Sequence, residues 1–315
     1  GLTRLIRRAG LDLRDKKVLI LGTGGTSRTA AYCAETLGAA CTLKVSRNPR
    51  DGAVSYAEAL QRHTDAQILL NTTPCGMYPH LAEQPLHPAA FHRLEGVVDV
   101  IYNPLRSRLV LEARALGIPA EGGLYMLVAQ AVRASELFLD TVWPEELTGR
   151  IYRRILREKE NIVLIGMPGS GKSSVGMLLQ ASTGKPLADS DRLIEQRAGK
   201  SIPEIFREEG EPAFRALESE VLLQLAEKGG QILSTGGGAV LRDENVTALK
   251  QNGRLFWLKR EVDGLIPTED RPLADTREKM ARLCLDREPV YRAAADEIID
   301  APASPEAAAT EIESR

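Results

Sequence analysis

The sequence predicts an α/β protein of two domains, each built around a parallel β-sheet. A β-branched run, a glycine-rich turn and a helix follow one another twice, over 18–38 and over 162–184. Short apolar runs separated by helical stretches come after each copy, which is the pattern of parallel strands joined by right-handed crossovers. A length of 315 residues also suits two domains of ordinary size. We expect the first domain over 1–145, a linker or terminal helix over 146–158, and the second domain over 159–315.

Each expected element has a local signal. The first strand is the run from Val18 to Leu21, and Gly38 is the expected stop of the helix after the turn. In the second copy the strand covers 162–165 and the helix ends before Gly184. Further strands are expected at short apolar runs, over 41–45, 68–71 and 97–101 in the first domain and over 186–189, 231–234, 254–258 and 297–299 in the second.

Composition and charge exclude several classes of protein. The 41 Lys and Arg residues are matched by 43 Asp and Glu, so the basic excess of a nucleic-acid-binding protein is missing. No apolar run approaches the roughly 18 residues of a membrane span. The four cysteines form no C-x-x-C pair and have no histidine at metal-ligand spacing. We therefore expect a cytoplasmic protein with reduced thiols and with neither a nucleic-acid nor a membrane partner.

The second glycine-rich turn fits G-x-x-x-x-G-K-[ST] over residues 166–173 without a mismatch. In this motif backbone N–H groups at a helix N-terminus wrap a polyphosphate, a lysine reaches its outer oxygens and a hydroxyl contacts Mg²⁺. Lys172 and Ser173 occupy the last two positions. The motif predicts a nucleotide-binding site, and a chance glycine-rich turn is the alternative.

Acidic residues and glycines follow at the ends of later strands. Asp189 and Asp191 flank Ser190, and on a strand two residues so spaced would both point toward the crevice at the carboxyl edge of the sheet. One carboxylate can hold Mg²⁺ through water while the other accepts a proton from an attacking hydroxyl. Capping of a loop is the alternative. The glycines 236–238 indicate a backbone that a ligand approaches closely, or else a flexible loop.

Three isolated arginines complete a family resemblance. Arg215, Arg271 and Arg287 are candidates for contacts with carboxylate or phosphate oxygens, although each taken singly also suits an exposed surface. Together with the phosphate loop, the segments DSD, PAFRALE, STGGGAV, RPL and REPVY resemble the shikimate kinase family over 161–300. The resemblance implies a parallel sheet of the P-loop NTPase-like, nucleoside monophosphate kinase type. It also implies ATP and Mg²⁺ as cofactors and shikimate as the substrate, phosphorylated on its 3-hydroxyl.

The same resemblance implies a role for each residue of the site. Lys172, Asp191 and Arg271 would be catalytic, and Ser173 and Asp189 would position Mg²⁺. The ATP phosphates would be bound by Gly169, Ser170, Gly171, Lys172, Ser173, Ser174 and Arg271, and shikimate by Asp191, Arg215, Gly236, Gly237, Gly238 and Arg287. The lid before RPL is shorter and more acidic than in many members of the family. Lid closure is therefore expected to depend on Arg271 alone.

The first glycine-rich turn indicates a dinucleotide site. It reads G-x-G-G-x-S, formed by Gly22, Thr23, Gly24, Gly25, Thr26 and Ser27, which alone is a weak signal. The next expected strand runs into Ser46 and Arg47, where a site that prefers NAD has an acidic residue. A hydroxyl and a guanidinium suit a 2′-phosphate. This pair therefore predicts NADP(H) as the cofactor, and a turn with one surface arginine is the alternative.

Later segments of the first domain carry a second family resemblance. With the first turn, NTTPCGMYP (71–79), VVDVIYNPLRS (97–107) and EGGLYMLVAQA (121–131) resemble the cofactor domain of shikimate dehydrogenase, from residue 1 to about 140. The resemblance implies a Rossmann-like doubly wound sheet, with Val100, Gly123 and Met126 lining the nicotinamide pocket and Tyr102 and Gln130 contacting shikimate. A core methionine and a surface glutamine are the alternative for Met126 and Gln130.

In that family a substrate domain with a catalytic lysine and aspartate precedes the cofactor fold. We therefore expect a truncated dehydrogenase with weak or absent turnover, fused to a complete shikimate kinase of aromatic amino acid (chorismate) biosynthesis. A kinase for another small sugar acid and a nucleotide-binding module without catalytic activity are the alternatives to this interpretation.

Overall fold

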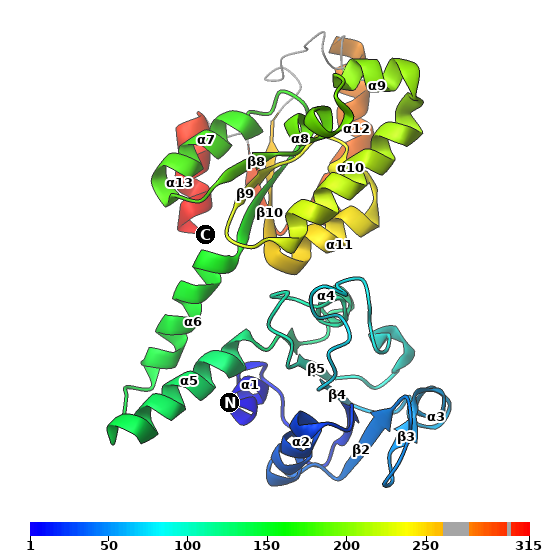
Figure 1. The fold of residues 1–315 in the computed structure, drawn as a ribbon, viewed down its shortest axis with the longest axis vertical. Coiled ribbons are helices and arrows are strands. Elements are labelled where there is room, and N and C mark those ends of the chain that lie inside the picture. The colour runs from blue at the N-terminus through cyan, green and yellow to red at the C-terminus, as the bar shows by residue number, and fades with distance from the viewer. Residues whose placement is uncertain (261–276, 301–303) are drawn as a thin grey trace. The chain divides into compact units, whose positions relative to one another are not determined.

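The computed structural model describes residues 1–260, 277–300 and 304–315. The chain forms two compact units, Gly1–Leu156 and Arg157–Arg315 (Figure 1). Among the described residues, no helix is both long enough and apolar enough to cross a bilayer.

The N-terminal unit contains a six-stranded parallel sheet in the order β3-β2-β1-β4-β5-β6. Its strands are β1 (Lys17–Leu21), β2 (Cys41–Ser46), β3 (Val54–Ser55), β4 (Ile68–Asn71), β5 (Gly96–Asp99) and β6 (Ala120–Glu121). Strand β1 pairs with β2 on one side and with β4 on the other. The order of winding reverses between β1 and β4, which is where doubly wound sheets bind ligands.

Helices cover both faces of this sheet. They are α1 (Leu2–Arg8), α2 (Gly25–Thr36), α3 (Tyr56–Arg62), α4 (Arg108–Ala115) and α5 (Leu124–Leu139), with the 3-10 turn η1 (Pro88–Ala90). Val18 and Ile20 of β1 pack with α1 and α2, while Leu19 and Leu21 pack with α3 and α4. Successive side chains of a strand point to opposite faces, so β1 is buried on both sides, as a central parallel strand requires.

Helix α6 (Glu146–Lys159) crosses the boundary between the two units in sequence. In its N-terminal part, Tyr152 meets Tyr125 of α5 edge to face, with the ring centroids 5.4 Å apart. The guanidinium carbon of Arg8 lies 4.8 Å from the centroid of Tyr125 and 4.4 Å from that of Tyr152. This cation–π contact joins α1, α5 and α6 within the N-terminal unit.

The C-terminal unit contains a five-stranded parallel sheet in the order β11-β10-β7-β9-β8. Its strands are β7 (Asn161–Ile165), β8 (Leu187–Asp189), β9 (Ile232–Ser234), β10 (Gly253–Lys259) and β11 (Glu297–Asp300). The central strand β7 pairs with β10 and β9. The carboxyl end of β7 therefore lies in the middle of one edge of the sheet, between the carboxyl ends of β10 and β9.

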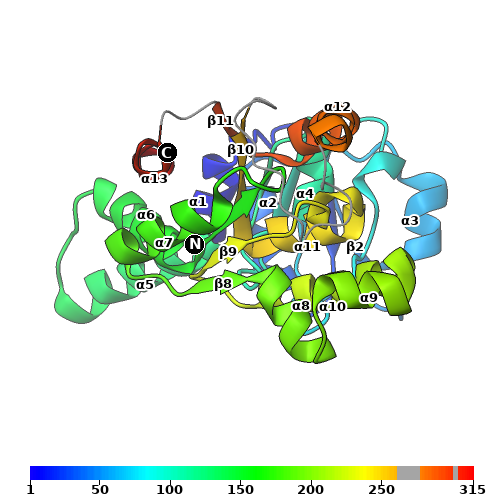
Figure 2. The ribbon, with the colours of Figure 1, turned by 90° about the horizontal axis from the view of Figure 1, so that it is seen from above.

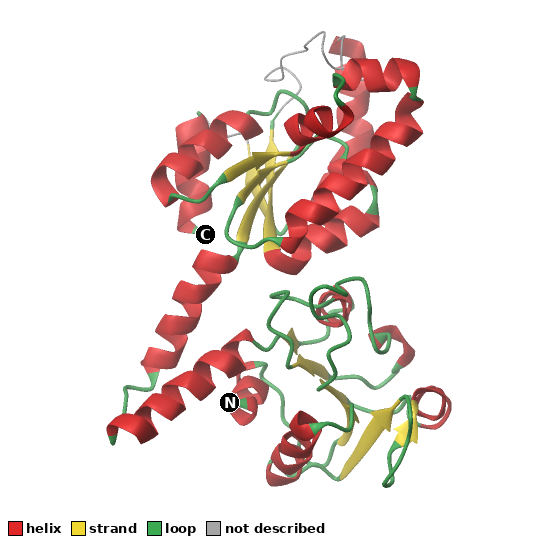
Figure 3. Cartoon of the chain, viewed as in Figure 1, coloured by secondary structure: helices red, strands yellow, loops and turns green. Residues whose placement is uncertain are grey.

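Helices again cover both faces, as Figure 3 shows. They are α7 (Lys172–Thr183), α8 (Ser190–Ala198), α9 (Ile202–Glu208), α10 (Gly210–Glu227), α11 (Asp243–Asn252), α12 (Arg277–Ala294) and α13 (Pro305–Ser314), with the 3-10 turn η2 (Ala239–Leu241). Helices α7 and α13 lie side by side on one face (Figure 2) and share a core with Leu164 and Phe256. Helices α10, α11 and α12 pack on the other face against Val163 and Trp257.

The longer strands predicted from the sequence are confirmed, but three details differ from expectation. The edge strands β3 and β6 contain only two residues each, too few for a recognisable alternation. Strand β5 ends at Asp99, so Val100 and Ile101 lie beyond it. The placement of Asp191 on a strand is wrong: β8 ends at Asp189 and α8 begins at Ser190, because Asp189 caps that helix.

Asn161 at the start of β7 gives a test of the C-terminal core. Its side chain, 1% exposed, donates to Lys228 O (2.7 Å) and accepts from Gln231 N (3.0 Å). Replacing Asn161 with Ala leaves the buried Gln231 N–H without this acceptor, whereas Lys228 O keeps Gln231 Nε2 as a donor (3.1 Å), so we expect a loss of about 1–3 kcal/mol in the free energy of unfolding. Urea unfolding of the C-terminal unit measures it. Gln180→Ala, at an exposed position, is the control, and equal stability of the two variants would contradict the prediction.

Candidate functional site

The glycine-rich loop of the C-terminal unit joins β7 to α7. Gly166 has φ of 145°, and a Cβ atom at this position would lie 2.8 Å from Leu258 O. Glycine is required because it adopts this positive φ without strain and has no Cβ atom to collide with the neighbouring strand. Gly171, at φ 91°, is the N-cap of α7, so the loop ends at a helix N-terminus. Such a terminus has unpaired N–H groups and a positive dipole end, which favour an anion.

Two cations contact the loop itself. Lys172 is 8% exposed, and its Nζ donates to Gly166 O (2.8 Å) and Met167 O (2.9 Å). Arg260, directly after β10, donates from Nε to Ser170 O at 3.1 Å. The sequence analysis missed Arg260, although its position at the carboxyl end of a strand beside β7 is a usable signal.

Asp189 caps α8, which is the alternative role that the sequence left open for it, and it also contacts the start of α7. Its Oδ1 caps α8 by accepting from the backbone N–H of Asp191 (3.1 Å) and of Arg192 (3.3 Å). Its Oδ2 accepts from Ser173 Oγ at 3.4 Å. One carboxylate oxygen thus fixes the start of α8 while the other faces the first residues of α7.

The three glycines after β9 lie against side chains of the same site. A Cβ atom at Gly236 would lie 2.5 Å from Asp191 Oδ1, and one at Gly238 would lie 2.0 Å from Arg215 Nη1. Gly237 O accepts from Arg287 Nη1 (2.9 Å) and from the Tyr291 hydroxyl. Glycine is therefore required here because a carboxylate and a guanidinium pack on the backbone.

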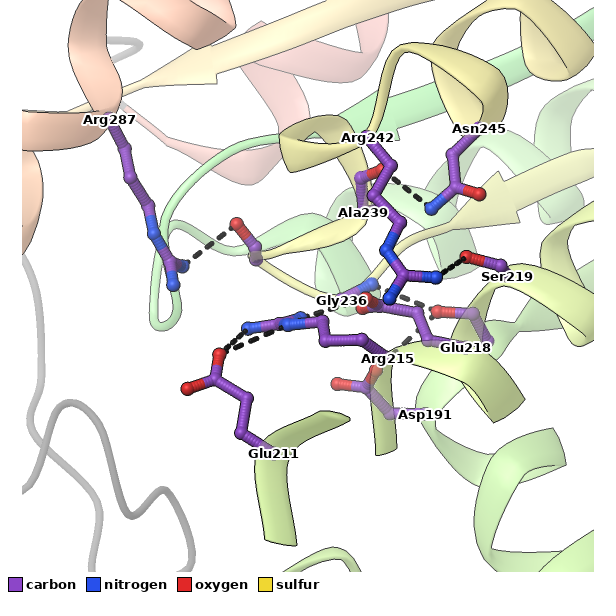
Figure 4. Close-up of polar contacts among 12 residues, drawn as sticks. Asp191, Glu211, Arg215, Glu218, Ser219, Gly236, Ala239, Arg242, Asn245 and Arg287 are labelled. Atoms are coloured by element: carbon purple, nitrogen blue, oxygen red, sulfur yellow. Dashed lines mark hydrogen bonds and ion pairs between the residues drawn. The ribbon is translucent and has the colours of Figure 1, made fainter. Parts of the chain in front are cut away.

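Arg215 of α10 lies between two glutamates of its own helix (Figure 4). Its Nη1 donates to Glu218 Oε2 at 2.7 Å, and Glu218 is 1% exposed. Burial raises the pKa of Glu218, and the ion pair with Arg215 offsets this only in part. Glu218 Oε1 accepts no hydrogen bond from a described residue and lies near the backbone of Gly236. The sequence analysis missed Glu218, whose signal is its spacing of three residues from Arg215 on a helix.

These groups share one cavity of about 720 Å³. The sequence-predicted residues that line it are Gly169, Gly171, Lys172, Ser173, Ser174, Asp189, Asp191, Arg215, Gly236, Gly237, Gly238 and Arg287. Ser170 of the loop is buried and does not line the cavity. Phe206 and Phe214, which the sequence analysis did not single out, form part of the wall. Arg271 lies outside the described residues.

The glycine-rich turn of the N-terminal unit follows β1. Gly22, at φ 110°, donates from N to Val45 O at 2.8 Å. Thr23, Gly24, Gly25 and Thr26 are exposed, and Gly24 is the N-cap of α2. Ser27, at the position of the usual third glycine, is fully buried, and its Oγ donates to Gly24 O at 2.6 Å. A small side chain that bonds within the turn thus keeps the helix close to the strand.

The other residues predicted to bind the cofactor or shikimate lie at or just after the end of β2, follow β5, precede α5 or lie on it. Ser46 ends β2, and Arg47, which follows it, is exposed. A Cβ atom at Gly123 would lie 2.0 Å from Val100 O, so these two residues are in contact. Tyr102 is half exposed. On α5, Met126 packs partly into the core while Gln130 is exposed and contacts Gly1.

A buried carboxylate organises the loop that contains Val100. Asp99 Oδ1 accepts from Asn71 Nδ2 and from Ile101 N, each at 3.0 Å, and Oδ2 accepts from Ser107 Oγ at 2.6 Å. Val100 N in turn donates to Asn71 O at 3.1 Å. Burial raises the pKa of Asp99 to about 6, because the hydrogen bonds compensate only part of the lost hydration.

The parallel sheet and the glycine-rich loop between β7 and α7 define the C-terminal unit as a P-loop domain. The family model for shikimate kinase matches residues 168–315. A shikimate kinase from Pseudomonas savastanoi pv. phaseolicola is 42% identical over 147 residues, which cover 44% of this chain and 86% of that protein. One from Symbiobacterium thermophilum is 42% identical over 144 residues, 43% of this chain and 83% of that protein. The chain belongs to the shikimate kinase family.

Solved structures are similar to each unit. Shikimate kinase from Acinetobacter baumannii in complex with shikimate aligns with 51% of this chain and 93% of its own, at 33% identity and a TM-score of 0.47. A chorismate mutase/shikimate 5-dehydrogenase fusion protein from Clostridium acetobutylicum aligns with 49% of this chain, at 29% identity and a TM-score of 0.46. This chain spans 58% of that fusion protein.

Asp99 makes the stability of the N-terminal unit depend on pH. Its folded-state pKa of about 6 lies above the ordinary 3.8, so between about pH 4 and about pH 6 the folded unit binds more protons than the unfolded chain. Stability therefore falls as the pH rises through this window, by at most ~3 kcal/mol from this group. We expect Asp99→Asn to flatten this part of the curve of thermal midpoint against pH.

The control for Asp99→Asn is Asp51→Asn, at an exposed position. This control should keep the slope of the unsubstituted protein. An unchanged slope in Asp99→Asn would assign the pH dependence to other groups.

Proposed function

We propose that the C-terminal unit transfers the γ-phosphoryl group of ATP to the 3-hydroxyl of shikimate, giving ADP and 3-phosphoshikimate. One observation carries the proposal: a single cavity contains the phosphate loop, the Asp191 carboxylate and the guanidinium groups of Arg215 and Arg287. The phosphate loop suits a nucleotide, and Asp191 with the two arginines suits a hydroxylated carboxylic acid. The substrate named for the Acinetobacter baumannii kinase gives further support.

The phosphate loop and Lys172 would bind and neutralise the ATP phosphates. In the structure Lys172 Nζ is held by loop carbonyls, so a nucleotide would have to draw it toward its own oxygens. Ser173 and Asp189 offer a hydroxyl and a carboxylate oxygen 3.4 Å apart, a donor set that suits Mg²⁺ completed by water and phosphate oxygens. Bound there, Mg²⁺ would neutralise charge on the transferred group.

Asp191 would accept the proton of the attacking hydroxyl. Its position beside Gly236, near the loop and inside the cavity, supports this role. Arg215 and Arg287, which contact Gly238 and Gly237, would hold the carboxylate and so orient the ring. Catalysis would come mainly from positioning and charge neutralisation. Closure of the lid over the phosphates by Arg271 is part of the same proposal and concerns a residue outside the described ranges.

Replacing Asp191 with Asn keeps the shape of the side chain and removes the proton acceptor. We expect kcat for shikimate phosphorylation to fall by about 10² or more, with ATP affinity unchanged, because a positioned general base contributes about 10²–10⁴. A coupled assay of ADP release measures it. An unchanged kcat in Asp191→Asn would show that Asp191 is not the proton acceptor. Phosphorylation of another sugar acid in preference to shikimate would overturn shikimate as the substrate.

For the N-terminal unit we infer NADP(H) binding across the carboxyl ends of β1 and β2. The exposed turn at the N-terminus of α2 suits a pyrophosphate, and Ser46 and Arg47 at the end of the neighbouring strand suit a 2′-phosphate. The contact of Gly123 with Val100 supports a nicotinamide pocket beyond them. A cytoplasmic location, where ATP and NADP(H) are both available, fits the two units.

Arg47→Glu tests the cofactor preference. Loss of a charge-assisted hydrogen bond of about 1.5–3 kcal/mol should raise the Kd for NADPH roughly ten- to hundredfold. The Kd for NADH should change little, because NADH has no 2′-phosphate. Nucleotide fluorescence titration measures both. Arg62→Glu, an exposed charge reversal on α3, is the control, and equal loss of NADPH and NADH affinity in Arg47→Glu would overturn the assignment.

A further inference from the structure

The guanidinium of Arg215 is already bound to a carboxylate that does not line the cavity. Arg215 donates from Nε (3.2 Å) and from Nη2 (3.1 Å) to Glu211 Oε1. Figure 4 shows the Glu211 carboxylate at the outer end of the Arg215 side chain. A pair of neighbouring N–H donors is what an arginine presents to a carboxylate ligand. Part of the anion-binding capacity of Arg215 is thus used by the protein itself.

The two glutamates on Arg215 differ in how firmly they are held. The side chain of Glu218 is 1% exposed and its contact is 2.7 Å long, so removing it from Arg215 would leave a buried charge without its partner. The side chain of Glu211 is 48% exposed, and its contacts are longer. Water screens an ion pair whose carboxylate is half exposed, so the pair with Glu211 is weaker than the buried pair with Glu218. Glu211 is therefore the replaceable partner.

Glu211 also has a favourable position after it leaves Arg215. It lies in the first turn of α10, where the positive end of the helix dipole stabilises a carboxylate. Its exposure lets water replace the arginine contacts. Release of Glu211 consequently costs little free energy, whereas Arg215 stays fixed by Glu218.

The charges in and beside the cavity favour such a release when an acidic substrate binds. Arg215 is shared by two carboxylates, and Asp191 raises the pKa of Glu218, so a third negative charge lies close by. Arg287, which also lines the cavity, donates to Gly237 O. An incoming carboxylate that bridges Arg215 and Arg287 meets less repulsion when Glu211 has moved away.

We propose that Glu211 is a specificity-determining residue that competes with the substrate carboxylate for Arg215. The inference depends on the proposed shikimate kinase function and identifies what the acid group must displace. A substrate with a carboxylate replaces Glu211 and restores the contacts of Arg215. A neutral analogue cannot replace it, so Arg215 stays occupied and contributes nothing to binding. The affinity of an acidic substrate therefore depends on how much better its carboxylate binds Arg215 than Glu211 does.

The test is Glu211→Gln in the full chain, measured with shikimate and with an analogue in which a hydroxymethyl group replaces the carboxylate. An amide competes less well for a guanidinium, so KM and the directly measured Kd for shikimate should fall about two- to fivefold. The change should be confined to binding rather than kcat and should shrink in high salt. The KM for the neutral analogue should not fall.

Glu220→Gln is the matched control, because Glu220 lies on the same helix, is exposed and pairs with Arg197 instead. It should leave both substrates unaffected. A higher or unchanged KM for shikimate in Glu211→Gln would overturn the inference, since the first result would make Glu211 a support for Arg215. Absence of shikimate phosphorylation in the unsubstituted chain would instead overturn the proposed kinase function. The two failures are therefore distinguishable.

Discussion

The carboxyl ends of parallel strands meet at one edge of a sheet, and both candidate sites depend on this constraint. In the C-terminal unit, β7 leads into the phosphate loop, β8 ends at Asp189, and β9 leads to the glycines that contact Asp191 and Arg215. In the N-terminal unit, β1 and β2 deliver the glycine-rich turn and Arg47 in the same way. Each candidate site is therefore formed by residues that are far apart in sequence but follow strands ending at the same edge of a sheet.

The second constraint is the lack of room for a side chain at three glycines. Gly236, Gly238 and Gly123 each lie so close to another group that a side chain would collide with it. At the first two positions the colliding group is a charged side chain of the site, and at the third it is the Val100 carbonyl. The glycines thus let charged side chains and carbonyls approach the chain more closely than any other residue permits.

The sequence predicts the parts of this arrangement that are local. Strands such as β4 and β7 and the phosphate loop follow from apolar runs and from glycine spacing within about ten residues. The sequence did not decide whether Asp189 caps a helix or binds an ion, because a carboxylate after a strand can do either. Glu218 and Glu211 were missed although they lie three and four residues from Arg215 on one helix, because this spacing alone does not show that the pairs lie at the site. Arg260 was missed because its contact with Ser170, 90 residues away, exists only in the folded chain. The short edge strands have too few residues to show a period.

The attachment of Lys172 to the carbonyls of Gly166 and Met167 has a consequence for inhibitor design. A phosphate mimic competes with these two carbonyls for the three N–H donors of the ammonium group. A compound that leaves them intact, and presents an apolar face to Phe206 and Phe214, would bind the chain with its lysine still withdrawn. Such a compound would not need to imitate the charge of ATP.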